Sequence, residues 1–257
     1  MISKNRIKDI HALGLKKNRD SLGLFVAEGP KIVSELLHVF TCTYIAYTQD
    51  WFSSHVSELP ENIPFQDEVT NLELAKASFL QTPQQVIAIF KKPEVVSPSS
   101  KFAQKDICLA LDGVQDPGNV GTILRLADWF GIEHLFCSPD TADVFSPKVV
   151  QASMGAISRV QVHKVSLPEF LETLPDDIPV YGTFLDGKDI HRSELSPNGI
   201  IVMGNEGNGI RPETEVRIKY KLFIPSYPVG RPTSESLNVA IATAITCEEF
   251  RRRAIKT

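Results

Sequence analysis

The stretch "IVMGNEGNGI", residues 201–210, joins a short apolar run to a loop of glycine, asparagine and glutamate. The run Ile201–Met203 is typical of a buried strand. The loop places glycines at 204, 207 and 209 around Asn205 and Glu206. A tight turn needs one or two glycines, so this loop favours close approach of the backbone to a ligand. Its order, G-x-x-G-x-G, differs from the G-x-G-x-x-G of dinucleotide-binding folds, which disfavours an NAD site.

Apolar runs and helical patterns alternate on both sides of this stretch. This alternation predicts a parallel sheet covered by helices on both faces. In such sheets the ligand binds beyond the carboxyl ends of the strands, so the loops that follow strands are candidate sites. The expected strands are residues 107–114, 132–138, 178–185, 199–205 and 221–226, and the expected helices are 119–131, 147–157, 168–174, 212–219 and 234–255.

A stretch rich in serine and proline, residues 91–106, interrupts the apolar periodicity and indicates an exposed linker, placed at 96–105. Before it, residues 1–95 predict a small α/β domain with strands at 23–29, 42–48 and 84–90 and an amphipathic helix at 31–40. After it, residues 106–257 contain every element expected for the parallel sheet. The chain therefore predicts two domains.

The charge is unevenly distributed. The chain of 257 residues has a net charge of −4 and a pI near 5.9, which argues against a protein that coats nucleic acid through bulk positive charge. Residues 1–20, however, carry six Lys or Arg and two Asp, a net charge of +4. This basic cluster, which includes Lys16, Lys17 and Arg19, is either a solvated face or a surface that binds RNA phosphates.

Membrane, metal and redox signals are weak. No run of about 18 apolar residues occurs, and no apolar signal segment follows the basic N-terminus, so we expect a cytoplasmic protein. The four cysteines lie far apart without a C-x-x-C pair, which indicates neither a zinc site nor a redox motif. Reduced, buried thiols are the expectation.

Two further loops carry polar residues next to expected helices. In "DGVQDPGNVGTILRLADWFG", residues 112–131, Asn119 is well placed to cap a helix. Arg125 lies among apolar residues, where it needs a carboxylate, a phosphate or water; an exposed stripe on the helix is the alternative. In residues 224–245, Ser236 and Asn238 lie at the mouth of a helix that is apolar nearly all round, and Ser234 is a candidate cap. Such a helix is buried within the subunit or between subunits.

Three motifs occur in a defined order: "NVGTILR" (119–125), "VMGNEGNG" (202–209), and Ile224 and Pro225 followed by "SLNVA" (236–240). In them the chain resembles the SpoU (TrmH-like) family of RNA ribose 2'-O-methyltransferases. Residues 7–37 are similar to the substrate-binding domain, related to a small ribosomal protein, that precedes the catalytic domain in many members. "SPKVVQASMGAI" (146–157) is also similar, but Gln151 stands where the family often has Arg, so Gln151 is not assigned an RNA contact.

The resemblance implies a SPOUT fold: a C-terminal α/β domain whose parallel sheet contains a deep trefoil knot, preceded by a small ribosomal-protein-like α/β domain. It also implies S-adenosylmethionine as cofactor, RNA as partner, a homodimer, and chemistry that needs no metal. The implied cofactor-binding residues are Met203, Gly204, Asn205, Glu206, Gly207, Gly209, Ile224, Pro225, Ser236, Leu237 and Asn238. The implied catalytic residues are Arg125, Glu206, Asn119, Ser236 and Asn238, and the RNA-binding set is Lys16, Lys17, Arg19 and Arg125.

The implied reaction moves a methyl group to a ribose 2'-hydroxyl, which is a far weaker acid than neutral pH requires. The family assigns its activation to the arginine at position 125. An arginine has a pKa above about 12, so we expect Arg125, positioned by Asn119 and oriented by Glu206 or a substrate phosphate, to stabilise the alkoxide electrostatically. The front domain favours large-subunit ribosomal RNA as substrate. The alternative is a non-catalytic RNA-binding or ribosome-assembly protein that retains the fold.

Overall fold

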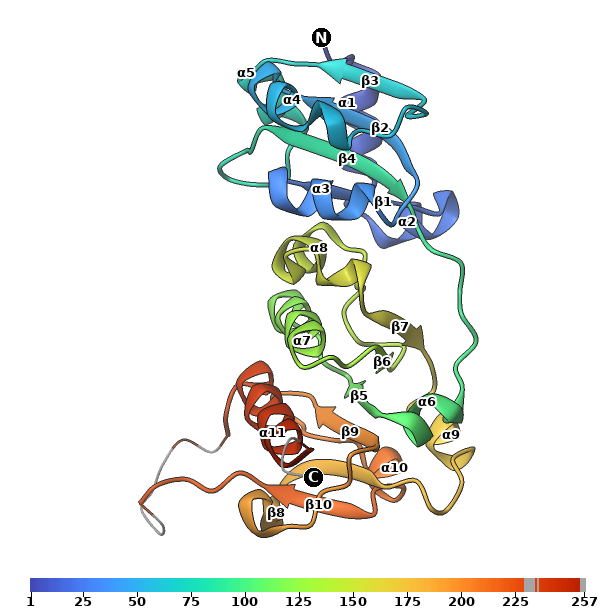
Figure 1. The fold of residues 1–257 in the computed structure, drawn as a ribbon, viewed down its shortest axis with the longest axis vertical. Helices are drawn as coiled ribbons and strands as arrows, with labels where there is room; N and C mark the ends of the chain where they lie inside the picture. The colour runs from blue at the N-terminus through green and yellow to red at the C-terminus, as the bar shows by residue number, and fades with distance from the viewer. Residues whose placement is uncertain (229–233, 235, 255–257) are drawn as a thin grey trace. The chain divides into compact units, whose positions relative to one another are not determined.

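The structure, a computed structural model, describes residues 1–228, 234 and 236–254. The chain forms two compact units (Figure 1). Unit 1 comprises Met1–Glu94 and Asp143–Ser158, and unit 2 comprises Val95–Ala142 and Arg159–Thr257. The predicted boundary near residue 95 coincides with the first division, but residues 143–158 lie in unit 1 and not with the rest of the C-terminal segment.

Unit 1 is built on a four-stranded sheet in the order β1-β4-β2-β3. Strand β4 pairs antiparallel with β1 and β2, and β3 pairs parallel with β2. The strand β3 has no apolar alternation in its sequence FQDE and was not predicted. The strands are β1 (Leu24–Glu28), β2 (Cys42–Tyr47), β3 (Phe65–Glu68) and β4 (Val86–Lys91); the helices are α1 (Lys4–Ala12), α2 (Lys16–Leu22), α3 (Pro30–Leu37), α4 (Gln49–His55), η1 (Val56–Glu58), α5 (Asn71–Ala77), α8 (Pro147–Ser153) and η2 (Ala156–Ser158).

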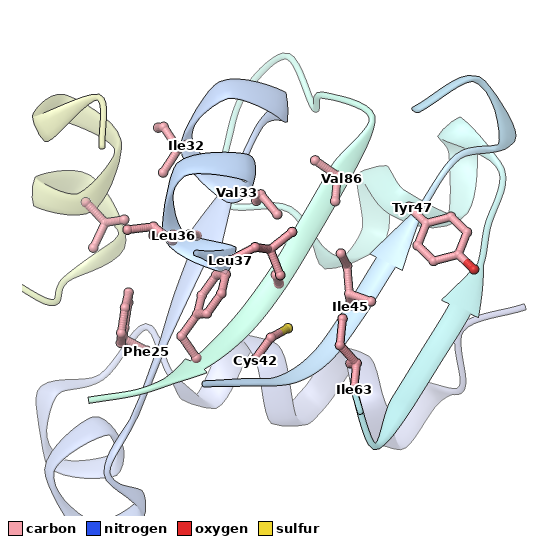
Figure 2. Packing of buried hydrophobic residues seen from close by; sticks show 14 of the residues in the cluster. Phe25, Ile32, Val33, Leu36, Leu37, Cys42, Ile45, Tyr47, Ile63 and Val86 are labelled. Atoms are coloured by element: carbon pink, nitrogen blue, oxygen red, sulfur yellow. The ribbon is translucent and has the colours of Figure 1, made fainter. Parts of the chain in front are cut away.

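Helices cover both faces of this sheet. The apolar side chains of α3, among them Val33 and Leu36, are buried in one cluster with strand residues such as Phe25 and Val86 (Figure 2). The 3.6-residue period places them on one side of the helix, which confirms the predicted amphipathic helix. Residues of α1 and α5, such as Ile10 and Leu74, form a second buried cluster with other residues of the same strands.

The helix α8 belongs to the core of unit 1 although its sequence follows the linker. Val150 and Ile157 are buried in the same cluster as Phe25 and Val33. The helix predicted at 147–157 is divided, because Met154 adopts a left-handed conformation with φ 50° and ends α8. Fold prediction from sequence order misses this placement because residues 143–158 find their apolar partners more than a hundred residues away along the chain.

Part of the predicted linker is helical. Residues Ser100–Lys105 form α6, and Ala103 is fully buried in the core of unit 2. Ser99 caps this helix by accepting a hydrogen bond from the backbone N–H of Lys101 at 3.3 Å. Within the predicted linker, residues 96–99 lack regular structure, so the prediction of an exposed linker at 96–105 is wrong for its second half.

Unit 2 contains a six-stranded sheet in the order β10-β8-β9-β5-β6-β7. All its neighbouring strands are parallel, which confirms the predicted sheet. The strand β7 was not predicted. The strands are β5 (Ile107–Asp112), β6 (His134–Cys137), β7 (Gln161–Lys164), β8 (Val180–Asp189), β9 (Gly199–Gly204) and β10 (Tyr220–Phe223), and the remaining helices are α7 (Pro117–Trp129), α9 (Leu167–Glu172), η3 (Ile190–Arg192), α10 (Pro212–Glu215) and α11 (Val239–Ala254).

The helix α11 begins later than the sequence suggests. The predicted helix spans 234–255, of which Glu235 and Ile255 lie outside the described residues, whereas α11 starts at Val239. The cap is Asn238, whose Oδ1 accepts the backbone N–H groups of Ala240 at 3.0 Å and Ile241 at 3.3 Å. The helix then packs against α7. The trefoil knot stays a prediction.

The four cysteines are free and buried, as predicted. Burial raises the pKa of each thiol to about 12, so none is reactive near neutral pH. Within the described residues, no helix is both long and apolar enough to cross a membrane.

Candidate functional site

The candidate site lies where the order of strands in unit 2 reverses. From β5 the chain moves to β6 and β7 on one side of the sheet, and β9 pairs with β5 on the other side. The Cα atoms of Asp112 and Gly204 are register partners at the carboxyl ends of β5 and β9. The loops that follow these strands, 113–116 and 205–210, belong to the predicted stretches 112–131 and 201–210 and therefore emerge side by side at the point where open parallel sheets bind ligands.

The cap of α7 is Asp116 and not Asn119. The carboxylate of Asp116 accepts the backbone N–H of Asn119 at 2.7 Å, and Pro117 occupies the first turn. The prediction that Asn119 caps this helix is wrong. Its side chain, in the first turn of α7, is free to make contacts with other loops.

Asn119 joins the three motifs. Its Nδ2 donates a hydrogen bond to Oε1 of Glu206 at 2.5 Å. Its Oδ1 accepts a hydrogen bond from Nδ2 of Asn238 at 3.0 Å. Asn238 in turn caps α11. We call Asn119, Glu206 and Asn238 the polar triad; it brings together predicted catalytic residues from the first turn of α7, the loop after β9 and the residue before α11.

Asn205 shapes the glycine loop. Its backbone exchanges two hydrogen bonds of 2.9 Å with Gly209, which closes the loop. Its side-chain Oδ1 accepts the backbone N–H groups of Gly207 and Asn208 at 2.9 and 3.1 Å, and its Nδ2 donates to the carbonyl of Gly113 at 2.8 Å. The side chain of Asn205 thus uses its hydrogen bonds to hold the glycine loop and to join it to Gly113. This structural role explains an asparagine at this position besides the predicted cofactor contact.

Glycine has a different role at each of the positions 204, 207 and 209. A Cβ on Gly204 would lie 2.3 Å from the carbonyl carbon of Gly209, so only glycine lets the two ends of the loop meet. Gly209 has φ +68°, a conformation that side chains rarely adopt. A Cβ on Gly207 would meet only Asn205 Oδ1, at 3.5 Å, and otherwise open space. Loop closure explains Gly204 and Gly209, and Gly207 leaves the surface of the loop clear.

An ion pair between the buried Asp112 and the half-buried Arg211, which the sequence did not reveal, fixes the loop to β5. The carboxylate of Asp112 is fully buried and accepts the backbone N–H of Arg211 at 3.0 Å and its Nε at 2.7 Å. The guanidinium also lies 3.6 Å from Asp140. Hydrogen bonding to Asp112 raises the pKa of Arg211, and the hydroxyl of Ser138 lowers the pKa of Asp140. The signal was an aspartate that ends an otherwise apolar strand.

Arg125 is exposed on α7, and neither hydrogen bond of the polar triad involves it. It makes no hydrogen bond or ion pair with the described part of the chain. The predicted positioning of Arg125 by Asn119 is not seen, because Asn119 bonds Glu206 and Asn238 instead. The position of Arg125 agrees with the alternative of an exposed stripe on the helix. Its guanidinium is available to a phosphate or a hydroxyl.

The other predicted cofactor residues surround the ends of β9, β10 and α11. Ile224 and Pro225 are half-buried directly after β10, and Ser236 and Leu237 are exposed before α11. The side chain of Met203 is buried, so only its backbone could contact a ligand. Their role in cofactor binding stays a prediction.

The structure separates the predicted RNA-binding residues. Lys16 and Lys17 are exposed on α2. Arg19 is only 2% exposed; it donates to the carbonyl of Leu13 at 2.7 Å and to Asp143 at 2.6 Å. A guanidinium held in this way cannot bind a phosphate, so the structure does not support the prediction for Arg19. Among the described residues no cluster of His, Cys, Asp or Glu could hold a metal ion.

Two protein-family models match this chain, one over each of its predicted domains. The model of the SpoU rRNA Methylase family matches residues 106–248, and the model of the MRM3-like substrate binding domain matches residues 4–88. The chain is 30% identical over 253 residues to the 23S rRNA (guanosine(2553)-2'-O)-methyltransferase RlmP of Bacillus subtilis, which covers 96% of each protein.

Solved structures have the same fold. A chain assigned to the TrmH family of RNA methyltransferases, from Porphyromonas gingivalis, is 42% identical with a TM-score of 0.88, covering 98% of this chain and 99% of that one. An AdoMet-bound rRNA methyltransferase from Sinorhizobium meliloti is 27% identical with a TM-score of 0.83, covering 98% and 97%. With its motifs assembled at the switch point of the sheet, the chain belongs to the SpoU rRNA methylase family.

Proposed function

We propose that the protein transfers a methyl group from S-adenosylmethionine to a ribose 2'-hydroxyl of large-subunit ribosomal RNA. The observation that carries this proposal is the polar triad, in which Asn119 of α7, Glu206 of the glycine loop and Asn238 before α11 are joined by hydrogen bonds. Relatives along the whole chain support it, since RlmP is named for methylation of a guanosine in 23S rRNA. A cytoplasmic location is part of the proposal.

The loop residues fit the cofactor. Adenosine needs backbone groups for its base edge and apolar surface for its ring. The open side of Gly207 leaves the backbone of the loop accessible. Leu237, which is 46% exposed, and the half-buried Ile224 offer apolar surface. S-adenosylmethionine would supply a methyl group already activated by its sulfonium charge.

The chain's own task is to activate the hydroxyl. As the ribose oxygen loses its proton it develops negative charge, which a nearby guanidinium stabilises electrostatically. Arg125 is suited to this because no described residue neutralises it. The exposed carboxylate of Glu206, held by Asn119, would orient that guanidinium when RNA is bound. The proton then leaves through water, because the guanidinium of arginine is already protonated at neutral pH and cannot accept another proton.

RNA capture is assigned to unit 1. Lys16 and Lys17 are exposed on α2, and Lys4 and Lys8 are exposed on α1. The substrate-binding family model covers this part of the chain. Positive side chains that release counterions from phosphates supply affinity without sequence preference.

A homodimer is also part of the proposal. Ile241 of α11 is 53% exposed, and Trp129 is 83% exposed on the neighbouring α7. Large apolar side chains left exposed on packed helices are typical of a surface that a second copy buries. Replacing Trp129 and Ile241 by glutamate should convert a dimer to a monomer in sedimentation experiments; unchanged sedimentation would place the interface elsewhere.

The test separates cofactor binding from chemistry. Arg125→Ala should keep the affinity for S-adenosylmethionine, measured by calorimetry, but lower methyl transfer to ribosomal RNA by about 10²-fold or more. Arg125→Lys should restore little, because an ammonium lacks the planar fork. Arg192→Ala, at another exposed arginine of unit 2, is the matched control. Wild-type protein that binds RNA but transfers no methyl group would favour the non-catalytic alternative.

A further inference from the structure

Unit 1 contains a cavity of about 270 Å³. It is lined by the end of β1, the loop after α5, and α8. All of these residues belong to unit 1, whereas the polar triad belongs to unit 2. The cavity is smaller than the roughly 300–1,000 Å³ of pockets for drug-sized ligands, so it suits one flat ring system.

A carboxylate forms part of the cavity wall. Glu28 is 5% exposed. Its Oε1 accepts the backbone N–H of Phe79 at 2.8 Å, and its Oε2 accepts the hydroxyl of Ser78. Burial raises the pKa of this carboxyl. An ionised carboxylate can accept about four hydrogen bonds, so two positions remain for donors on a ligand.

Apolar groups supply the rest of the wall: Val26, Leu80, Pro147 and Ala152. The ring of Phe79, 37% exposed, borders the same space. The ring packs closely against Gly14, since a Cβ at that position would lie 2.9 Å from Cε1 of Phe79. A supported and partly exposed aromatic face is the usual platform on which proteins stack an unpaired base.

Two polar side chains of α8 also line the cavity. Lys148 and Gln151 are three residues apart and therefore share one side of the helix. Neither side chain makes a hydrogen bond or ion pair with the described residues. The amide of Gln151 offers both a donor and an acceptor to a base edge, and the ammonium of Lys148 offers a charge to a phosphate.

We propose that this cavity binds one unstacked guanine of the RNA substrate, with Glu28 accepting its N1–H and N2–H groups. The inference rests on the proposed function, because it makes unit 1 read a base as well as bind phosphates. Guanine is the base that presents two adjacent N–H donors on one edge, which matches a carboxylate with two free acceptor positions. Adenine, cytosine and uracil each pair a donor on that edge with an acceptor, which Glu28 would repel.

The test uses full-length protein and single-stranded RNA probes. A short oligouridine with one central guanosine should bind more tightly than the same oligouridine without it, by at least about fivefold, the lower end for a bidentate side-chain–base contact. Glu28→Gln should remove this preference and retain affinity for the all-uridine probe. Glu68→Gln, at an exposed carboxylate of unit 1, should change neither value.

Further variants test the same site if Glu28→Gln fails to fold, which its melting temperature would reveal. Gln151→Ala should lower the guanosine preference, and Phe79→Ala should weaken binding of the guanosine probe. Gln81→Ala, at an exposed position before β4, is the matched control. Equal binding of the two probes by the wild type, or a preference that survives in all pocket variants, would overturn the inference.

Methyl transfer is measured on the same protein preparations, so that the two proposals fail separately. Wild-type protein that methylates ribosomal RNA but shows no guanosine preference would retain the proposed function and exclude the base pocket. Protein that prefers guanosine through Glu28 but transfers no methyl group would retain the pocket and exclude the proposed reaction.

Discussion

The side-chain amide of Asn119 donates a 2.5 Å hydrogen bond to the carboxylate of Glu206, 87 residues away along the chain. Its carbonyl oxygen accepts from Asn238 at the same time. One asparagine thus uses both ends of its amide to join the first turn of α7 to the loop after β9 and to the start of α11. This explains why an asparagine in the first turn of α7 matters although Asp116 caps the helix.

Replacing Asn119 by alanine should lower methyl transfer without unfolding the protein. The change leaves the carboxylate of Glu206 and the amide of Asn238 without their partner, while the cap of α7 stays in place. We expect kcat to fall by about 10²-fold, comparable to the loss of one preorganised hydrogen bond in an active site. Steady-state kinetics and a thermal melt of the same variant check this.

The matched control is Asp116→Ala, three residues earlier. It removes the cap and should lower the free energy of unfolding by about 1 kcal/mol. A variant Asn119→Ala that melts like Asp116→Ala and retains full activity would contradict the assigned role of the triad.

Two glycines of the loop should respond differently to the same substitution. Gly204→Ala forces a Cβ against the carbonyl carbon of Gly209, so we expect loss of S-adenosylmethionine binding together with a lower melting temperature. Gly207→Ala makes only an ordinary contact with Asn205 Oδ1, at 3.5 Å, and should leave stability unchanged. Gly207→Val should remove binding from a folded protein by covering the loop backbone. Calorimetry combined with thermal melts distinguishes the three; normal binding by Gly207→Val would place the cofactor away from this loop.

The basic residues of α2 should divide into two classes. Reversing Lys16 and Lys17 to glutamate should weaken RNA binding more at low salt than at high salt, with the slope of log K against log salt flatter by about one for each lost phosphate contact. Arg19→Ala should instead destabilise the protein by about 3–5 kcal/mol, because it leaves Asp143 without its buried partner. An unchanged slope for the double reversal would show that the two lysines are only a solvated face.

Glu249 should make stability depend on pH in the acid range. Its burial raises the pKa of the carboxyl, but hydrogen bonds from Arg252, Arg253 and His191 outweigh this and lower the pKa to about 2. Because the folded pKa lies below the unfolded value of 4.5, the stabilisation is present above about pH 4.5 and is lost as pH falls towards 2.

Urea midpoints of the wild type and of Glu249→Gln, measured from pH 7 to pH 2.5, test this dependence. The difference between the two proteins should shrink steadily below pH 4.5. A difference that stays constant over the whole range would mean that Glu249 keeps its ordinary pKa.

A fragment that begins near Lys105 should be unstable. The sequence suggests that residues 106–257 are self-sufficient, since they contain every strand of the parallel sheet. In the structure, Val150 and Ile157 are buried in the core of unit 1. Removing unit 1's first segment exposes this apolar surface, so we expect aggregation or dye binding, and a soluble, cooperatively melting fragment would show that α8 can pack without it.

The sequence by itself determined the parallel sheet of unit 2 except for β7, and it singled out the glycine loop that follows β9. Local signals suffice for these features. An apolar run of β5 or β9 specifies a buried strand whatever its neighbours are, and glycines 204 and 209 are required by backbone geometry within six residues. The helix α3 is likewise predictable from the sequence, because its apolar residues recur with the period of 3.6 residues of an α-helix.

Only the tertiary structure decided which side chains meet. The bond from Asn119 to Glu206, the burial of Arg19 against Asp143, and the packing of Val150 on unit 1 join residues 87 or more positions apart, or in separate segments of the chain. A hydrogen bond or a buried contact depends on distance in space, and neither leaves a periodic signal in the residues that make it. For this reason the sequence does not distinguish Arg19 from Lys17. In the structure the guanidinium of Arg19 is buried, whereas Lys17 is exposed to solvent.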